Sequence, residues 1–335
     1  MSTSPRAYAS VSASGSPPPV RAGARHYAEQ VTSARRTVLA VPGSSDRFIT
    51  KSQGLDVDAV FLDLEDAVAP PAKAEARDRI VAALNSGTWR APTVTVRVND
   101  WSSPWTTQDV WRVVTGAGGH LAALVLPKAQ SADHVRALDL VLSQAEREAG
   151  LPVGRIGLEV QIEDAAGLLH AAEIAGASAR LQSLVFGPGD FMASMGMATT
   201  NVGAQPPGYL GDAFHHALMT ILVAARAHGL QAIDGPFVAI RDVEGFRESA
   251  RRAAALGYDG KWVLHPGQVD AGNEIFTPSR PDIERSQRIV AAYEHATSEA
   301  GGAVGAIVVD DEMVDVAGLR VAQSLLAKGR AAGMC

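Results

Sequence analysis

Cysteine is almost absent from this sequence, and its scarcity excludes whole classes of site. The only cysteine is Cys335, the last residue, so the chain has no disulfide framework, no CxxC metal site and no internal thiol nucleophile. This usage suits a reducing compartment, and we expect a cytoplasmic protein. No apolar run approaches the roughly 18–20 residues that a membrane span requires, so no membrane-embedded segment is expected.

Aromatic residues and clusters of positive charge are also scarce. Aromatic side chains make up 5% of the 335 residues, whereas apolar residues make up 47%, enough for the core of one large α/β domain or two smaller ones. The formal net charge is −6, and no stretch is rich in Lys and Arg. The sequence therefore predicts neither nucleic acid nor an anionic membrane as the main partner, and any anionic ligand has to meet a local group of basic side chains.

Residues 1–34 differ in composition from the rest of the chain. They are rich in Ser, Ala and Pro, contain several Arg and a single acid, and show no apolar periodicity. We interpret them as a disordered tail. A mitochondrial transit peptide is the alternative, because it is also rich in Arg and Ser, but the PPP run at 17–19 interrupts an amphipathic helix.

From residue 35 onward, short β-branched runs alternate with amphipathic helical stretches such as VEGFRESARRAAALG (243–257), a repeated βα pattern that requires a parallel sheet. Eight units in about 240 residues predict an α/β fold, a closed (β/α)8 TIM barrel over residues 35–275. The rival is a doubly wound open sheet, which the lack of GxGxxG after the first strand disfavours. The expected strands are TVLAVPG (37–43), AVFLDLEDA (59–67), TVTVRVND (93–100), AALVLPK (122–128), GLEVQIED (157–164), SLVFGPGD (183–190), QAIDGPF (231–237) and GKWVLHP (260–266).

Three of these strands carry one apolar face and one polar face, because successive side chains point in opposite directions. In a barrel the apolar faces lie under the helices, and the polar faces line an interior that opens at the carboxyl ends of the strands. We therefore expect a polar pocket there; a structural ion network of these acids with Arg97 or Lys73 is the alternative. The polar faces consist of Asp63 and Glu65, of Thr93, Thr95, Arg97 and Asn99, and of Glu159, Gln161 and Glu163.

Two acids at the ends of neighbouring strands form a candidate metal site. Glu163 ends the fifth strand and Asp190 ends the sixth in GPGD (187–190), so both reach the rim of a barrel. Two carboxylates with water are typical of Mg²⁺, with Mn²⁺ as a possible substitute, and they leave positions open for an oxygen-rich substrate. No HxH or HExxH motif favours a softer metal. A helix N-cap is the alternative role for Asp190.

Basic side chains flank this candidate site. Arg97 lies on an adjoining wall, where a fixed guanidinium suits a carboxylate or an enolate oxygen. After the first strand, PGSSDRFITK (42–51) places Arg47 and Lys51 one helical turn apart, beside Gly43 and two serines. That corner suits a phosphate group, although basic side chains at helical spacing are often simply solvated.

The order of these motifs resembles the citrate lyase β-subunit family (HpcH/HpaI aldolase/citrate lyase), and within it the L-malyl-CoA/β-methylmalyl-CoA lyase branch. The resemblance covers about residues 35–330. It implies a TIM barrel, usually trimeric, that uses Mg²⁺ and no organic cofactor to cleave a 3-hydroxyacyl-CoA into acetyl-CoA or propionyl-CoA plus glyoxylate, and that catalyses the reverse condensation. The segments that carry it are VPGSSDRF, DLEDAVAPPAKAEAR, VRVND, LPK, EVQIEDAAG, FGPGDF, IDGPF and GKWVLHPGQ.

The resemblance also implies roles for individual residues. The metal acids fall on Glu163 and Asp190, and the arginine that polarises the substrate falls on Arg97. Glu65 would hold Arg97 in place and bind metal-bound water. A backbone contact with the substrate falls on Gly189.

Further contacts with the acyl-CoA are implied at both ends of the barrel sequence. CoA contacts fall near Lys51, and Ser45 stands where close relatives can have a basic residue, so the grip on CoA can shift to Arg47. Pocket contacts fall on Leu264 and His265, directly after the eighth expected strand.

The segment AIVVDDEMVDVAGLRVAQSLLAKG (306–329) resembles the family's C-terminal lid, which closes over a neighbouring subunit's site. Residues 276–335 are therefore expected to form a helical lid extension of a homo-oligomer, a trimer or a hexamer. Asp315 matches the acid that would remove the acetyl α-proton in the condensation direction.

Three other functions stay open. Some proteins with this scaffold are thioesterases that release malate, and an aldolase for free 2-oxo acids would share the metal acids without needing Arg47 and Lys51. A barrel retained only for binding or assembly is the non-enzymatic alternative. Gln161 and Asp164 flank Glu163 where apolar and small hydroxyl residues are usual, which leaves the preferred substrate open among malyl-CoA, β-methylmalyl-CoA and the related citramalyl-CoA.

Overall fold

Eight parallel strands close into a barrel in the computed structural model, which describes residues 33–298 and 305–334. Each strand pairs with the next in chain order, and β1 pairs with β8 to close the ring. Every strand overlaps the run predicted for it, so the (β/α)8 barrel is confirmed and the open sheet is wrong. The strands are β1 (Thr37–Pro42), β2 (Ala59–Asp63), β3 (Thr93–Arg97), β4 (Ala123–Leu126), β5 (Gly157–Ile162), β6 (Leu181–Phe186), β7 (Gln231–Asp234) and β8 (Gly260–Val263).

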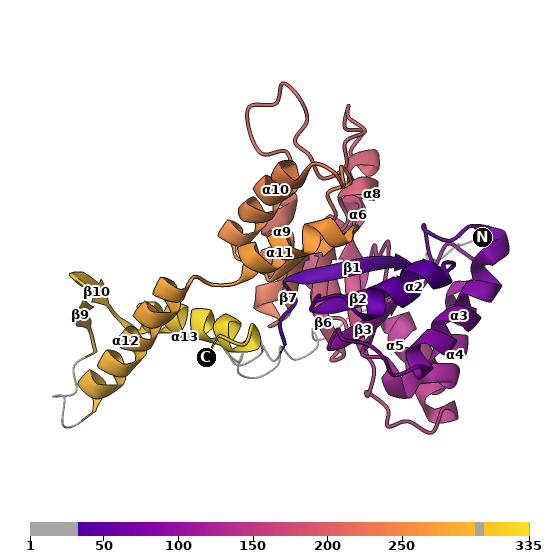
Figure 1. Cartoon of the computed structure of the whole chain (residues 1–335), viewed down its shortest axis with the longest axis horizontal. Helices are drawn as coiled ribbons and strands as arrows, with labels where there is room; N and C mark the ends of the chain where they lie inside the picture. Colours follow the sequence, from indigo (N-terminus) through magenta and orange to yellow (C-terminus); the bar gives the residue numbers. More distant parts are fainter. Residues whose placement is uncertain (1–32, 299–304, 335) are drawn as a thin grey trace, which may run out of the picture.

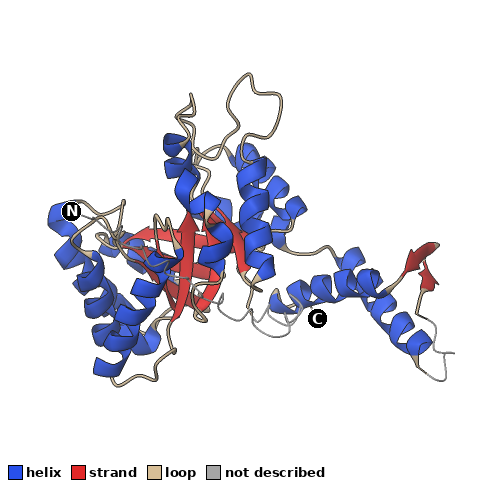
Figure 2. Ribbon diagram, turned by 180° about the vertical axis from the view of Figure 1, so that it is seen from behind, coloured by secondary structure: helices blue, strands red, loops and turns tan. Residues whose placement is uncertain are grey.

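Helices follow the strands and surround the barrel (Figure 2). In α10, Asp242 caps the first turn by accepting a hydrogen bond from the Gly245 N–H, and Gly257 ends the helix in a left-handed conformation that glycine adopts readily. The helices of the barrel are α2 (Asp46–Gln53), α3 (Lys73–Asn85), α4 (Thr106–Ala117), α5 (Ala132–Glu148), α6 (Ala165–Leu169), α7 (Ala171–Ala175), α8 (Pro188–Ser194), α9 (His215–Ala227), α10 (Val243–Leu256) and α11 (Val269–Phe276), with 3-10 turns η1 (Pro70–Ala72), η2 (Gly118–His120) and η3 (Pro266–Gln268).

The apolar core has two separate layers. The larger layer lies between the strands and the helices and contains the apolar faces predicted for β2, β3 and β5. The smaller layer fills the barrel interior and is centred on Phe61 and Trp262, whose rings lie 4.2 Å apart. The polar faces of the three strands therefore point inward, as their alternation predicts. One of these acids, Glu159, pairs with Arg35 at 2.6 Å near the amino ends of the strands, away from the predicted pocket.

The chain beyond α11 leaves the barrel as a C-terminal arm (Figure 1). The arm has its own small apolar cluster, in which α12, the hairpin and α13 pack together. The lid extension was predicted to begin at residue 276; α11 ends at Phe276, and α12 begins at Arg280. The arm consists of α12 (Arg280–Thr297), the antiparallel strands β9 (Ile307–Val309) and β10 (Glu312–Val314), and α13 (Val316–Ala331).

The C-terminal arm is anchored to the barrel at the end of α13. Lys328 Nζ donates to the backbone carbonyls of Gly257 and Tyr258 and lies 3.2 Å from a carboxylate oxygen of Asp259. These residues directly precede β8, so the anchor lies at the amino ends of the strands, opposite the predicted pocket.

The tail predicted over 1–34 lies outside the described residues except for its last two positions. No helix in the described part of the chain combines the length and the hydropathy that a membrane span requires.

Candidate active site

Arg97 ends β3 inside the barrel, where two carboxylates fix it. Its Nε and Nη2 donate to the two oxygens of Asp63, each at 2.7 Å, and its Nη1 lies 3.1 Å from Oε2 of Glu65. All three side chains are buried. Burial by itself lowers the pKa of Arg97, but the charges of Asp63 and Glu65 outweigh this effect and raise the pKa above its usual range. The guanidinium therefore stays charged at any physiological pH.

Arg97 keeps donor capacity for a ligand. A guanidinium has five N–H groups, and four contacts involve them: two with Asp63, one with Glu65 and one of 3.4 Å with Oε1 of Gln161. At least one N–H therefore remains for an oxygen of a bound molecule. Such a buried, oriented donor stabilises developing negative charge better than a solvated one does.

Glu163 follows β5 and is held between two donors. Its Oε1 accepts a hydrogen bond of 2.6 Å from the backbone N–H of Lys128, and its Oε2 accepts one of 2.9 Å from the side-chain amide of Gln161. Burial raises the pKa of Glu163 to about 8; Arg97 opposes this rise, while the charges of Glu65 and Asp190 add to it. Ionisation of Glu163 is therefore costly in this environment, because burial and the charges of Glu65 and Asp190 outweigh the opposing charge of Arg97.

Gly187 makes room for this arrangement. A β-carbon at position 187 would lie 2.3 Å from both Cβ and Oε2 of Glu163, so no larger residue fits without moving that carboxylate. The absence of a side chain at Gly187 therefore serves the packing of Glu163.

Asp190 and Gly189 lie in the first turn of α8, directly after β6. The helix begins at Pro188 with Gly187 as its cap residue, so the alternative role of Asp190 as an N-cap is wrong. Asp190 is half-buried, and in the described residues its side chain has neither a hydrogen bond nor an ion pair. Its charge nevertheless raises the pKa of Glu163, which places the two carboxylates in one electrostatic environment.

The alternative interpretation, a structural ion network of the strand acids with Arg97 or Lys73, holds for Arg97 but not for Lys73. Asp63 does pair with Arg97, but Lys73 donates to the carbonyl oxygens of Leu64 and Glu65 and to Oδ1 of Asn99, at 2.6–3.0 Å. Lys73 therefore fastens the turn after β2 to the loop after β3 without neutralising a carboxylate at short range.

Lys128 is a component of the site that the sequence reasoning missed. Its Nζ lies 2.6 Å from Glu65 and 3.3 Å from Asp66. Lys128 directly follows β4 in the LPK segment, and its position at the carboxyl end of a barrel strand was the available signal. Gln161 was noted only as unusual beside Glu163, whereas it bridges Arg97 and Glu163.

The corner after β1 is held by hydrogen bonds and presents two cations. Ser45 caps α2 by accepting a hydrogen bond from the Phe48 N–H, and Arg79 donates to the Ser44 carbonyl at 2.8 Å. Arg47 and Lys51 are exposed on α2, and neither pairs with another residue in the described ranges.

Leu264 and His265 follow β8 at the same end of the barrel. The Leu264 N–H donates to Oε1 of Gln268 at 2.8 Å, and the exposed His265 accepts at Nδ1 from the Gly267 N–H at 3.0 Å. Because β8 pairs with β1, both residues adjoin the corner that carries Arg47.

Asp315 lies apart from the other predicted site residues. It caps α13 in the C-terminal arm, where its Oδ1 accepts hydrogen bonds from the N–H groups of Gly318 and Ala317, and these bonds lower its pKa. Its second oxygen takes part in neither bond. The anchor residue Lys328 is about 20 Å further along the helix, at the opposite end of the barrel from Arg97. The arm of one chain therefore does not bring Asp315 to that chain's own site.

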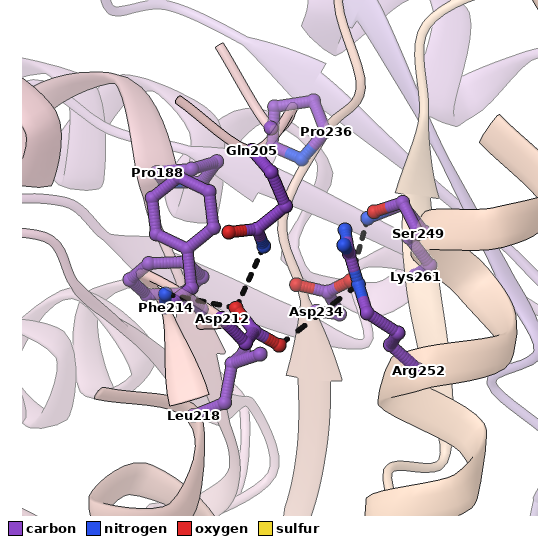
Figure 3. A pocket seen from close by; sticks show the side chains of 12 residues that line it. Pro188, Gln205, Asp212, Phe214, Leu218, Asp234, Pro236, Ser249, Arg252 and Lys261 are labelled. Atoms are coloured by element: carbon purple, nitrogen blue, oxygen red, sulfur yellow. Dashed lines mark hydrogen bonds and ion pairs between the residues drawn. The ribbon is translucent and has the colours of Figure 1, made fainter. Parts of the chain in front are cut away.

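A cavity lined by residues of β6, β7, β8, α9 and α10 includes none of the predicted site residues (Figure 3). It contains a fully buried ion pair, Lys261 with Asp234 at 2.5 Å, and burial lowers the pKa of Lys261. Asp212 accepts a hydrogen bond from Gln205 at 2.6 Å and faces Arg252 of α10. The residues that line it are Phe186, Pro188, Gly203, Gln205, Asp212, Phe214, Leu218, Asp234, Pro236, Ser249, Arg252 and Lys261. This network joins the loop after α8 to α10.

The arrangement at the carboxyl ends suits a hard divalent cation. Within the described ranges, no group of three or more His, Cys, Asp or Glu side chains is placed to hold a metal ion. Glu163 and Asp190 fit the smaller requirement of Mg²⁺, which accepts one or two carboxylates and keeps several water ligands. The burial of Glu163 near a second carboxylate, Asp190, favours a cation here, because a nearby positive charge would compensate the cost of ionising Glu163.

Comparisons with known proteins identify relatives of this chain. The profile of the HpcH/HpaI aldolase/citrate lyase family matches residues 36–266. An L-malyl-CoA/β-methylmalyl-CoA lyase of Cereibacter sphaeroides is 39% identical over 87% of this chain and 93% of its own length, and a (3S)-malyl-CoA thioesterase of the same organism is 36% identical over 88% and 95%.

A solved structure extends the likeness to three dimensions. The protein CitE of Mycobacterium tuberculosis, in complex with magnesium, acetoacetate and coenzyme A, superposes with a TM-score of 0.69 and 28% identity over 89% of this chain and 98% of its own. Since both the family profile and relatives above 30% identity cover most of the sequence, this chain belongs to the HpcH/HpaI aldolase/citrate lyase family.

Proposed function

We propose that this protein is a Mg²⁺-dependent lyase that cleaves malyl-CoA or β-methylmalyl-CoA into glyoxylate plus acetyl-CoA or propionyl-CoA, and that catalyses the reverse condensation. The observation that carries the proposal is the buried, charged Arg97 beside Glu163 and Asp190 at the carboxyl ends of the barrel strands. The relatives named as malyl-CoA/β-methylmalyl-CoA lyases supply the substrate class.

Glu163 and Asp190 would hold the metal ion, with Mn²⁺ as a possible substitute. Bound there, Mg²⁺ would supply Lewis-acid polarisation of the oxygens of glyoxylate. The N–H of Arg97 that no protein group uses would donate to the thioester oxygen and stabilise the enolate of the acetyl group. Gly189, beside the candidate metal acid, would let the substrate approach the backbone of α8.

The acyl-CoA would enter over the corner after β1. Arg47 and Lys51 are exposed cations without protein partners among the described residues, which suits the phosphate groups of CoA. Leu264 and His265 on the adjoining rim would contact the thioester end. An aldolase for free 2-oxo acids has no use for this corner, so Lys51→Glu would leave such an activity unchanged and weaken one on acyl-CoA.

The base that removes the acetyl α-proton would be Asp315 of a neighbouring subunit. The C-terminal arm projects from its own barrel (Figure 1), and its hairpin and Asp315 lie away from the anchor at Lys328. A homo-oligomer, a trimer or a hexamer, in which each arm covers the next barrel would complete every site. With Cys335 as the only cysteine, a cytoplasmic location fits this proposal.

Subunit exchange tests the shared site. Arg97→Ala and Asp315→Ala proteins are each expected to be nearly inactive. An equal mixture after exchange would regain up to about a quarter of wild-type activity, because a quarter of the sites combine two intact contributions. No regain after proven exchange would contradict a site shared between subunits.

Product analysis tests the activity itself. The protein is incubated with L-malyl-CoA with and without Mg²⁺, and glyoxylate, acetyl-CoA and free thiol are measured together. Glyoxylate and acetyl-CoA that form only with Mg²⁺ are the expected result. Free thiol and malate without glyoxylate would establish the second candidate, a thioesterase, which the 36% identical (3S)-malyl-CoA thioesterase favours.

A further inference from the structure

Five residues at the carboxyl ends of the strands form a closed ring of contacts. The Lys128 N–H donates to Glu163, whose other oxygen accepts from the amide of Gln161. The Gln161 carbonyl oxygen faces Arg97, and Arg97 pairs with Glu65. Glu65 returns the ring to Lys128, because its Oε1 lies 2.6 Å from Lys128 Nζ. The ring thus begins at the main chain of Lys128 and ends at its side chain.

Lys128 closes the ring in an unusual backbone conformation. Its φ is +50°, in the left-handed region that side chains other than glycine rarely adopt. The other two such residues in the described ranges, Asp310 and Asp311, form the turn of the arm's hairpin. A left-handed lysine within a barrel's catalytic end is a strained position that the surrounding contacts maintain.

We propose that Lys128 is the positioning residue that couples the candidate metal carboxylate Glu163 to the substrate-polarising Arg97. This inference rests on the proposed function, and it adds a residue to which the sequence analysis assigned no role. The main chain of Lys128 orients Glu163, and its ammonium group orients Glu65 against Arg97.

The burial of Glu65 and Glu163 explains why Lys128 alone can fix both carboxylates. Glu65 and Glu163 are each 3% exposed, whereas the Lys128 side chain is 29% exposed and reaches Glu65 from the rim. Glu163 packs so closely against Gly187 that a side chain at position 187 would not fit, and the Lys128 N–H holds Oε1 of the same carboxylate. Loss of the ammonium group would leave the Glu65 carboxylate with Arg97 as its one ion-pair partner in the described residues, and Arg97 would lose a fixed support.

Two pairs of variants separate the side chain from the main chain. Lys128→Met removes the ammonium group and Lys128→Arg keeps a cation, so kcat on L-malyl-CoA is expected to fall about 10–100-fold in the first and to recover most of that loss in the second. The thermal midpoint and KM should change little in both. Wild-type kcat in Lys128→Met, or a loss of thermal stability with kcat intact, would overturn the coupling role.

Lys128→Gly and Lys128→Ala test the main chain. Glycine adopts positive φ without strain, whereas alanine resists it. Isothermal titration with Mg²⁺ should therefore give an affinity near wild type for Lys128→Gly and one roughly fivefold or more weaker for Lys128→Ala. Equal affinities would overturn the proposal. If the wild-type protein binds Mg²⁺ but does not cleave malyl-CoA, only the proposed function is refuted. The Mg²⁺ affinities of Lys128→Gly and Lys128→Ala would still test the positioning role of Lys128.

Discussion

The affinity for Mg²⁺ should depend steeply on pH because of Glu163. Burial, with contributions from Glu65 and Asp190, raises the pKa of Glu163 from 4.5 to about 8 in the metal-free protein. That shift corresponds to about 5 kcal/mol of work against ionisation. A metal ligand has to be ionised, so binding near neutral pH releases the proton that Glu163 carries.

The magnitude follows from this pKa. With a pKa of about 8, the ionised fraction of Glu163 increases about 50-fold between pH 6 and pH 8, and the Mg²⁺ association constant should increase in proportion. Isothermal titration in buffers of different ionisation enthalpy measures both the affinity and the protons released, which should approach about one per ion at pH 6. Glu163→Gln is the matched control, because it keeps the shape of the side chain and cannot titrate.

The same shift has a consequence for stability. The pKa of Glu163 is higher in the folded chain than in the unfolded one. Its contribution to the free energy of unfolding is therefore fully present below about pH 4.5 and is lost as the pH rises through about 8. The thermal stabilisation that Mg²⁺ gives should therefore be larger at pH 8 than at pH 6. An affinity that stays constant over this range, or a pH dependence that persists in Glu163→Gln, would refute the assignment.

Three further predictions concern Asp190, Asp315 and the ion pair in the cavity of Figure 3. Asp190→Asn should abolish Mg²⁺-dependent turnover with an unchanged circular dichroism spectrum, and normal activity would exclude it as a ligand. Asp315→Ala should lower turnover while Mg²⁺ affinity stays within about twofold; equal losses would instead place Asp315 at the metal. Lys261→Met should destabilise the fold by roughly 3–5 kcal/mol in chemical unfolding, because it leaves Asp234 buried without its cation. The double variant with Asp234→Asn should regain most of that loss, and a double variant no more stable than Lys261→Met would contradict this explanation.

Alternation along single strands determined much of the site in advance. The period of two in β3 and β5 separates Val96 and Val160 from Arg97 and Gln161, and it puts the polar residues inside any closed barrel. Eight βα units of similar length then fix the closure and the end at which Glu163 and Asp190 meet. These features depend on local patterning, so the amino-acid order was sufficient to predict them.

Partners that lie far apart in the chain were decided only by the tertiary structure. Glu159 shares the inward face of Glu163, yet it pairs with Arg35, because its position along β5 places it at the other end of the barrel. The pairing of Lys128 with Glu65 joins residues 63 positions apart. It accompanies a left-handed backbone conformation at Lys128 that no sequence pattern predicted.

The sequence by itself thus determined the barrel, its polar interior and the residue types at its carboxyl end, because periodicity and strand order carry that information. The tertiary structure decided which acids are neutralised, how far burial raises the pKa of Glu163, and that the arm carries Asp315 away from its own barrel. These properties depend on distances and solvent exclusion between segments that are remote in sequence, and only the folded chain sets those.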